Sequence, residues 1–225
     1  LLNTHRVPDN VVRRMIAMMK SIYIAILCFF VCCALPVAGE TADELAAEGN
    51  ALYDADKYNE ALIILDKALA LDPDNLEALN GKGKTLKNMG LYEEAILQYD
   101  KAIEIDPNYK KAWNNKGIAL TYLERYDEAI EMFDESVRID PKYGKAYSNL
   151  AWCLGLAGRH EEALASAENA IKFAADYARG WSNRGDALFA LEQYKDALDS
   201  YETALILEPG LTDALEGKEK ALAKI

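Results

Sequence analysis

Residues 110–143 read KKAWNNKGIALTYLERYDEAIEMFDESVRIDPKY, and this 34-residue stretch decides the fold because its pattern recurs five times along the chain. Near the end of each copy stands a proline, replaced once by alanine: Pro73, Pro107, Pro141, Ala175 and Pro209. An alanine stands twelve residues before each of these positions, and a small residue, usually glycine, stands 24 residues before. Strict self-similarity at this spacing is typical of a solenoid, in which similar supersecondary units stack one on another.

Each unit is predicted to contain two amphipathic helices separated by a short break. In the quoted copy, Trp113, Gly117 and Leu120 are spaced by three or four residues, so they share one face of a helix. The second stretch begins at Tyr126 and also carries small and aromatic residues at helical spacing. Its end is predicted at the Asp-Pro pair, because proline disfavours helical geometry in the residue before it. Neither helix can bury its apolar face alone, so neighbouring units are expected to stack.

The order of a large residue, glycine, tyrosine or leucine, alanine, an aromatic residue and proline at these offsets resembles the tetratricopeptide repeat (TPR). The resemblance implies an all-α fold, a right-handed superhelical solenoid of five helix-turn-helix repeats followed by a C-terminal capping helix. That helix is expected to present a polar outer face. The solenoid is expected at residues 40–225, with repeats at 42–75, 76–109, 110–143, 144–177 and 178–211 and the capping helix at 212–225.

The fourth repeat is irregular, because Ala151, His160 and Ala175 replace the glycine, tyrosine and proline of other copies. Since proline is what stops the second helix elsewhere, we expect this helix to run past Phe173 into Ala174 and Ala175. The irregularity therefore predicts a longer second helix in this repeat.

Residues 1–39 have the composition of an export signal. The basic residues Arg13, Arg14 and Lys20 are followed by an uncharged stretch at 22–35, and Val37 and Gly39 are small residues placed before a cut. This order describes a secretory signal peptide, with cleavage before Glu40. The alternative is an uncleaved membrane anchor, although the apolar stretch is short for the roughly 20 residues of a spanning helix. In either case the repeats are expected to be extracytoplasmic, either secreted or anchored and facing outside.

The charge of the chain restricts its partners. It has 37 acidic and 25 basic residues, and residues 1–39 hold one of the acids and four of the bases. Residues 40–225 therefore hold 36 acids and 21 bases, a net charge of −15. Such an acidic surface repels nucleic acid and anionic lipid. We expect no nucleic-acid partner, and membrane contact only through the N-terminal segment if it stays uncleaved.

The sequence contains few residues of the types that form catalytic or metal sites. After residue 39 it holds a single histidine, His160, and a single cysteine, Cys153. His160 occupies the position of a packing tyrosine, and Cys153 lies where small buried residues usually stand. A metal site would need a cysteine pair or a second histidine. We therefore expect no catalytic residue, no metal site and no cofactor, and we interpret the chain as not being an enzyme.

The resemblance also predicts a binding groove. In tetratricopeptide solenoids the first helix of each repeat lines the concave face. The resemblance implies that positions two, five, six, nine and, at the rim, twelve or thirteen, counted from the start of each repeat, point into it. Repeats three to five place Lys or Arg at position two, one helical turn from Asn at position six. The predicted peptide-binding groove comprises Lys84, Lys111, Asn114, Asn115, Lys145, Asn149, Trp152, Arg179 and Asn183. Trp152 either packs against a small neighbour or anchors a ligand.

These residue types suit an extended peptide. An asparagine side chain has both a donor and an acceptor, so amides at regular spacing can clamp successive peptide groups. We expect these amides to face solvent in the free protein. The basic side chains complement acidic residues or a free C-terminus of a partner. The favoured hypothesis is a non-enzymatic protein–protein interaction module that binds an extended peptide or partner tail. The alternative is an assembly scaffold that uses its convex face or edges and has no dedicated peptide groove.

Overall fold

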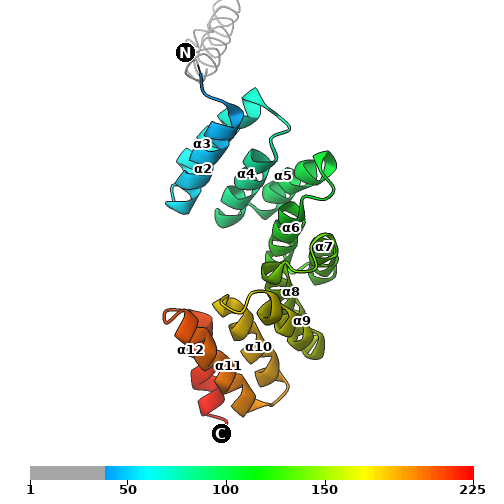
Figure 1. Ribbon diagram of the computed structural model, residues 1–225, viewed down its shortest axis with the longest axis vertical. Helices are drawn as coiled ribbons and strands as arrows, with labels where there is room; N and C mark the ends of the chain where they lie inside the picture. The colour runs from blue at the N-terminus through cyan, green and yellow to red at the C-terminus, as the bar shows by residue number, and fades with distance from the viewer. Residues whose placement is uncertain (1–38) are drawn as a thin grey trace, which may run out of the picture. The chain divides into compact units, whose positions relative to one another are not determined.

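The computed structural model describes residues 39–225, and this part of the chain contains eleven α-helices and no strand. Residues 42–225 form one compact unit of stacked helices (Figure 1). The prediction of an all-α repeat solenoid is therefore confirmed. The predicted export signal at 1–39 lies, except for its last residue, outside the described residues. Among the described helices, none is both long and apolar enough to cross a membrane.

Every repeat contributes a first helix of 13 residues and a second helix of 14 residues. The pairs, in chain order, are α2 (Ala42–Asp54) and α3 (Tyr58–Leu71), α4 (Leu76–Asn88) and α5 (Tyr92–Ile105), α6 (Lys110–Tyr122) and α7 (Tyr126–Ile139), α8 (Gly144–Leu156) and α9 (His160–Phe173), and α10 (Ala178–Ala190) and α11 (Tyr194–Leu207). A final helix, α12 (Thr212–Leu222), follows them.

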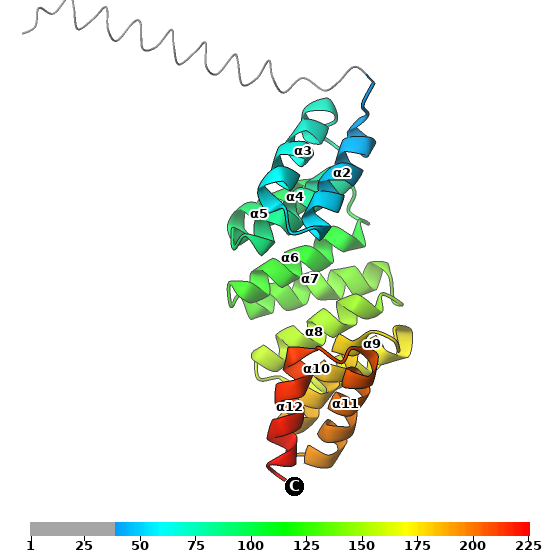
Figure 2. The same ribbon diagram turned by 90° about the vertical axis from the view of Figure 1, so that its left-hand side faces the viewer.

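The helices of residues 42–225 stack one after another along a curved array (Figures 1 and 2). In Figure 1 the first helices α4 and α6 lie nearer the open left-hand side, whereas the second helices α5 and α7 lie to the right. The first helices therefore face the concave side of the array, and this arrangement positions the candidate site.

The turn between the two helices of each repeat contains one residue with left-handed backbone. In three repeats this residue is acidic, with φ of 58° at Asp56, 59° at Glu124 and 61° at Glu192, and in the others it is Gly90 or Gly158. Glycine adopts this conformation without steric cost, whereas an acidic residue does so with some strain. All five residues occupy the same position of their repeats, so the packing of the helix pair sets the turn geometry.

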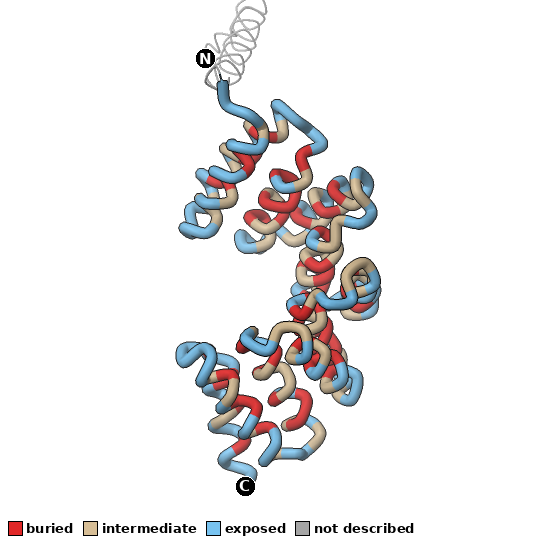
Figure 3. Tube along the Cα trace, in the orientation of Figure 1, coloured by how far each residue is buried: buried red, intermediate tan, exposed pale blue. Residues whose placement is uncertain are grey.

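The core is a series of clusters along the stack. Buried apolar residues of the described chain form four clusters, each shared by neighbouring helices. Figure 3 shows the buried residues on the sides where helices face each other and the exposed residues on the outer sides. Stability therefore depends on contacts between adjacent helices, as expected for a solenoid.

The repeated glycine of the first helix is required by close packing. A Cβ added to Gly83 would lie 2.4 Å from Cε1 of Tyr99, and one added to Gly117 would lie 2.7 Å from Cε1 of Phe133. In each case the ring of the second helix rests directly on the glycine. The glycine and the aromatic residue are therefore two parts of one contact.

The fourth repeat has different residues at these two positions. Ala151 stands in place of the glycine and Ala167 in place of the aromatic residue, and both are fully buried. A methyl group on the first helix is tolerated because the second helix offers a methyl group instead of a ring. The loss of the glycine is thus matched by the loss of the ring.

The prediction of a longer second helix in the fourth repeat is wrong. Helix α9 ends at Phe173 and has the same length as the other second helices. Ala174 is extended, with φ of −148°, and the N–H group of Tyr177 donates to its carbonyl oxygen at 3.0 Å. The same hydrogen bond joins Tyr143 to Asp140 in the preceding repeat, also at 3.0 Å.

A tryptophan explains why proline is dispensable at this turn. Nε1 of Trp181 donates to the carbonyl oxygen of Ala175 at 2.9 Å. Trp113 makes the equivalent hydrogen bond to Pro107, also at 2.9 Å. The following helix therefore holds the turn in place through a side-chain contact, whichever residue occupies the proline position.

The last helix, α12, covers the end of the stack with small residues. Ala214, Gly217 and Ala221 are buried against the preceding helices. The expected polar outer face is wrong in part, because Leu215 is 45% exposed and Leu222 is 52% exposed. In the other repeats a second helix covers these positions, and no such helix follows α12 in the described residues. The helix also ends at Leu222 instead of continuing to residue 225.

Candidate peptide-binding groove

The predicted groove residues all lie on first helices, which face the concave side of the array. By helix, they are Lys84 on α4; Lys111, Asn114 and Asn115 on α6; Lys145, Asn149 and Trp152 on α8; and Arg179 and Asn183 on α10. Stacking brings residues of successive repeats next to each other, so the chain spacing of about 34 residues becomes a side-by-side arrangement.

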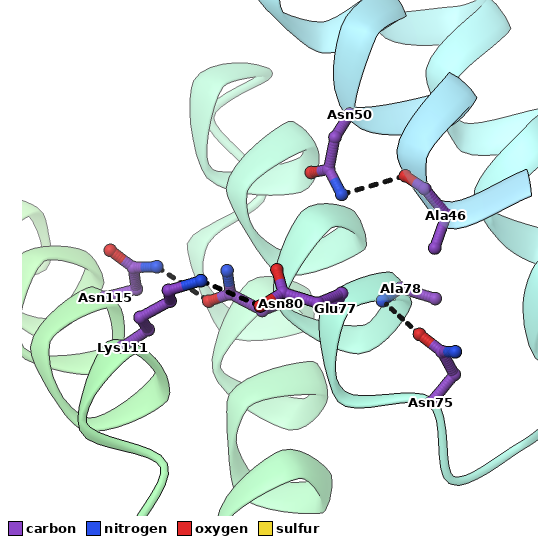
Figure 4. Close-up of polar contacts among 8 residues, drawn as sticks. All are labelled: Ala46, Asn50, Asn75, Glu77, Ala78, Asn80, Lys111 and Asn115. Atoms are coloured by element: carbon purple, nitrogen blue, oxygen red, sulfur yellow. Dashed lines mark hydrogen bonds and ion pairs between the residues drawn. The ribbon is translucent and has the colours of Figure 1, made fainter. Parts of the chain in front are cut away.

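The asparagines of successive repeats are joined by hydrogen bonds. Nδ2 of Asn115 donates to Oδ1 of Asn80 at 2.7 Å, as Figure 4 shows. Nδ2 of Asn149 donates in the same way to Oδ1 of Asn114 at 2.9 Å. Each bond runs from position six of one repeat to position five of the preceding repeat. We call this row of inter-repeat bonds the amide ladder.

The ladder continues into the fifth repeat and ends at α12. Nδ2 of Asn183 donates to the backbone carbonyl of Ser148 at 2.7 Å and to its hydroxyl at 3.0 Å. The next residue in the series of acceptors is Ser182, whose position-six neighbour on α12 is Gly217. Glycine has no side chain to donate, and Oγ of Ser182 is buried without a hydrogen-bond partner in the described residues.

The expectation that the groove amides face solvent is wrong in part, because the position-six asparagines are half-buried and donate to the preceding repeat. Asn80 is 5% exposed and Asn114 is 4% exposed, and the asparagines at position six are half-buried. The amides are occupied because stacking places position six directly beside position five of the previous repeat. Oδ1 of Asn149 and Oδ1 of Asn183 accept no hydrogen bond from the described residues. These amides therefore each keep one acceptor for a ligand.

Several basic side chains form ion pairs between neighbouring repeats. Position seven of a repeat pairs with position 25 of the preceding repeat, 16 residues earlier, in four places: Lys82–Asp66 at 2.6 Å, Lys116–Asp100 at 2.6 Å, Arg184–Glu168 at 4.0 Å and Lys218–Glu202 at 2.9 Å. The recurring spacing of 16 residues between opposite charges is a signal that the sequence analysis missed. It separates structural cations from those available to a partner.

Most basic side chains on the concave side have no acidic ion-pair partner among the described residues. Lys84, Lys87, Lys145 and Arg179 form no ion pair with any described residue. Lys111 is the exception among the predicted residues, because its Nζ lies 2.7 Å from Oε1 of Glu77 (Figure 4). In a chain with excess acid, unpaired cations on the concave side are a specific feature of this surface.

Two of these cations are partly buried. Nζ of Lys84 lies 4.0 Å from the centroid of the Tyr53 ring, and burial lowers the pKa of Lys84. Burial also lowers the pKa of Lys87, and repulsion from Lys84 and Arg179 lowers it further. Arg179 lies three repeats further along the chain than Lys87. Lys87, at position twelve, was absent from the predicted groove.

Trp152 packs against an aromatic ring, whereas the sequence predicted either packing against a small neighbour or contact with a ligand. Its ring meets the ring of Tyr122 edge-on, with centroids 5.4 Å apart and planes at 60°. It also lines a cavity of about 450 Å³ between α8, α10 and α12. The indole is half-buried, so one part of it packs and another part remains available to a ligand.

The cavity beside Trp152 is acidic. Asp186, Asp213 and Glu216 line it, together with Lys220. The hydroxyl of Tyr201 donates to Oδ1 of Asp186 at 2.8 Å. Burial raises the pKa of Asp186 to about 6, although solvent reaches the side chain from the cavity, and the Tyr201 hydrogen bond opposes this rise. Sequence reasoning missed this cavity because its lining comes from several helices.

The histidine and the cysteine have separate environments. His160 lines the same cavity, whereas Cys153 is fully buried and its thiol donates to the carbonyl of Tyr126 at 3.7 Å. Burial raises the pKa of Cys153, which disfavours a reactive thiolate. Within residues 39–225, no group of three or more His, Cys, Asp or Glu side chains is arranged to hold a metal ion.

Three family models match the chain. Residues 110–176 match a model described as tetratricopeptide repeat, and residues 178–211 match another model with the same description. Residues 54–136 match a model described as anaphase-promoting complex, cyclosome, subunit 3. Among curated proteins, no sequence matches the chain.

Solved structures share the fold. YrrB, described as a TPR protein with an unusual peptide-binding site, is 24% identical with a TM-score of 0.58, over 81% of this chain and 94% of YrrB. MamA is 24% identical with a TM-score of 0.60, over 76% of this chain and 93% of MamA. A thermophilic TPR protein of Thermus thermophilus is 22% identical with a TM-score of 0.70, over 81% of this chain and all of that protein.

Proposed function

Because the chain belongs to the tetratricopeptide repeat family and is a protein–protein interaction module, we propose that its concave groove binds an extended, acidic peptide or tail of a partner protein. Members of this family are typically non-catalytic interaction scaffolds. We propose the same for this chain, with no cofactor. YrrB is a precedent for peptide binding on this fold.

The observation that carries the proposal is the set of unpaired cations on the concave side. Lys84, Lys87, Lys145 and Arg179 have no carboxylate partner among the described residues, whereas the position-seven cations do. Crowded cations that repel one another gain from an anionic ligand, since each charge-assisted hydrogen bond is strong. Acidic side chains or a free C-terminal carboxylate supply that charge.

The amide ladder supports the proposal in a second way. Its inter-repeat bonds hold the first helices at a regular spacing, so the concave surface is organised before a ligand arrives. The remaining acceptors of Asn149 and Asn183 can receive backbone N–H groups of an extended chain. The ladder thus orients the surface while the cations attract the ligand.

The first prediction tests the cations with a defined probe. A capped, fluorescent dodecapeptide of Gly and Ser that carries four Asp residues should bind, and the same peptide with Asn in place of Asp should bind more weakly. The variant Lys84→Ala/Lys87→Ala/Arg179→Ala should lose about tenfold or more in affinity for the acidic peptide. Each charged hydrogen bond contributes about 1.5–3 kcal/mol, and about 1.4 kcal/mol corresponds to a factor of ten. Fluorescence anisotropy measures both affinities.

A matched control separates local contacts from net charge. The variant Lys82→Ala/Lys116→Ala/Lys218→Ala removes the same charge from the position-seven row, and it should bind the acidic peptide almost like the parent chain. Equal weakening in both triple variants would show that only net charge matters. Full affinity in the concave variant would instead favour a scaffold that uses the convex face, where Glu131 is exposed.

We also propose that the repeats act outside the cytoplasm. The support is the composition of residues 1–39, and helix α2 begins at Ala42, just after the predicted cut before Glu40. The prediction is that native protein begins at Glu40 or within one or two residues of it, because signal peptidase recognises the small residues before that position. Intact mass and N-terminal sequencing check this. A native chain that retains residues 22–35 would instead support the membrane anchor.

A further inference from the structure

The cavity between α8, α10 and α12 has the dimensions of a ligand site. Its volume of about 450 Å³ falls within the range of about 300–1,000 Å³ that is usual for small-molecule pockets. Small residues, among them Gly155, Ala190 and Gly217, line it and leave space, and the rings of Trp152 and Phe189 line it as well. Aromatic rings beside open space suit a ligand with an apolar stem.

The charge of this cavity is opposite to that of the unpaired cations Lys84, Lys87, Lys145 and Arg179. Asp186, Asp213 and Glu216 contribute three carboxylates, and the ammonium group of Lys220 lies 3.6 Å from Glu216. Asp186 and Asp213 form no ion pair with any described residue. Asp186 accepts a hydrogen bond from the hydroxyl of Tyr201, which is neutral. The cavity therefore has more negative charge than its own residues neutralise.

The surroundings of Asp186 make its negative charge costly, although solvent reaches the side chain from the cavity. The pKa of Asp186 is raised to about 6, first by burial and also by the nearby Asp213. Near neutral pH the carboxylate is mostly ionised although its surroundings disfavour the charge. A cation placed in the cavity would relieve this cost, because an opposite charge stabilises the ionised form.

We propose that this cavity, defined by Trp152, Asp186, Phe189, Asp213 and Glu216, receives a lysine or arginine side chain of the peptide that lies in the groove. The proposal rests on the proposed function and deepens it. A basic side chain packs its apolar stem along the rings and presents its charge to the carboxylates. The partner segment therefore carries acidic residues toward the unpaired cations and a basic residue toward α12, which sets the direction in which it binds.

The cavity can be tested without any acidic peptide. The probes are N-acetyl-L-arginine methylamide and its neutral isostere N-acetyl-L-citrulline methylamide, titrated into ¹⁵N-labelled full chain. We expect the arginine probe to shift the NMR signals of the Trp152 indole and the Gly155 and Gly217 amides, with saturation in the millimolar range. The citrulline probe should bind at least threefold more weakly. Equal responses to the two probes would overturn the proposal.

Two variants assign the preference to the carboxylates. Asp186→Asn/Asp213→Asn should abolish the preference for arginine, and Asn at position 186 keeps an oxygen that accepts the Tyr201 hydrogen bond. The control Glu104→Gln/Glu131→Gln removes two exposed charges from outside the cavity and should keep the preference. An arginine preference that survives in the Asp186 and Asp213 variant would overturn the proposal.

A further binding experiment tests whether one peptide occupies both the groove and the cavity. The acidic dodecapeptide is extended at either end by arginine or by citrulline, and one arginine-extended form should bind several-fold more tightly than its citrulline counterpart. If the acidic peptides bind and arginine gives no gain at either end, the inference fails while the proposed function stands. If no acidic peptide binds yet the arginine probe does, the proposed acidic-peptide function fails and the cavity remains a cation site.

Discussion

Replacing Gly117 with leucine should destabilise the fold by on the order of 1–3 kcal/mol or more, because the new side chain would overlap the ring beneath it. Even the first atom of that side chain, Cβ, would lie 2.7 Å from Cε1 of Phe133, a ring with no exposed surface. Urea denaturation followed by circular dichroism measures the loss.

A second glycine provides the matched control. Gly155 lies in the first helix of the next repeat, and a Cβ there would meet nothing within 4 Å. Gly155→Ala should therefore be neutral or stabilising by about 0.4–1 kcal/mol, since alanine restricts the unfolded chain. Gly117→Ala should destabilise. If the two alanine variants unfolded at the same urea concentration, the proposed ring contact would be absent.

The fourth repeat suggests a compensating variant. Phe133→Ala alone should cost about 3–5 kcal/mol, the usual range for removing a buried phenylalanine side chain. Gly117→Ala/Phe133→Ala copies the natural pair Ala151 and Ala167, so the double variant should lose less stability than the sum of the single variants. Coupling of about 0.5–3 kcal/mol is typical of residues in direct contact. Additive losses would show that the natural pair does not work by compensation.

Replacing Asn115 with alanine should cost about 1–3 kcal/mol, well above the ±0.5 kcal/mol of an ordinary surface change. The substitution removes the donor to Oδ1 of Asn80, which is 5% exposed. It also removes the acceptor of Nδ2 of Asn114, which lies 3.2 Å from Oδ1 of Asn115. Oδ1 of Asn80 and Nδ2 of Asn114 would then each lose a hydrogen-bond partner, so the interface between repeats two and three should weaken. Urea denaturation gives the size of the loss, and hydrogen exchange locates it.

An exposed asparagine serves as the control. Asn59 lies exposed in the first turn of α3, and its side chain forms no hydrogen bond with the described residues, so Asn59→Ala should stay within about ±0.5 kcal/mol. Removing both partners in Asn80→Ala/Asn115→Ala should cost less than the sum of the two single changes, because the second change leaves no additional unpaired amide. Equal stability of Asn115→Ala and Asn59→Ala would remove the amide ladder as a structural element.

The ladder changes how the predicted groove should be interpreted. Sequence reasoning placed Asn115 and Asn149 in the binding surface, and the structure places them between repeats as well. Loss of binding after an asparagine substitution would therefore mix ligand contact with altered stacking. The cations give the cleaner test, since Lys145 and Arg179 are exposed and carry no ion pair among the described residues.

The sequence by itself determined the helical architecture. Glycine, alanine and the aromatic residue recur at helical spacing within each 34-residue unit, so the helix pairs and their stacking follow from which residues need burial. The end of α9 predicted from a single residue was wrong. Ala175 predicted a longer α9, but the indole of Trp181 holds the turn through a contact between helices.

Only the tertiary structure decided which polar residues remain available. The inter-repeat contacts join residues 16 or about 35 positions apart, and they exist because stacking brings equivalent positions of neighbouring repeats together. They engage Lys116 and Asn115 and leave Lys87 unpaired, although all three look like ordinary polar residues in the sequence. The acidic cavity arises in the same way, since Trp152 and Asp213 meet there only because α8, α10 and α12 pack together on the concave side. Helix periodicity is a local property of the chain, whereas the pairing or isolation of a charge depends on neighbours that only stacking supplies.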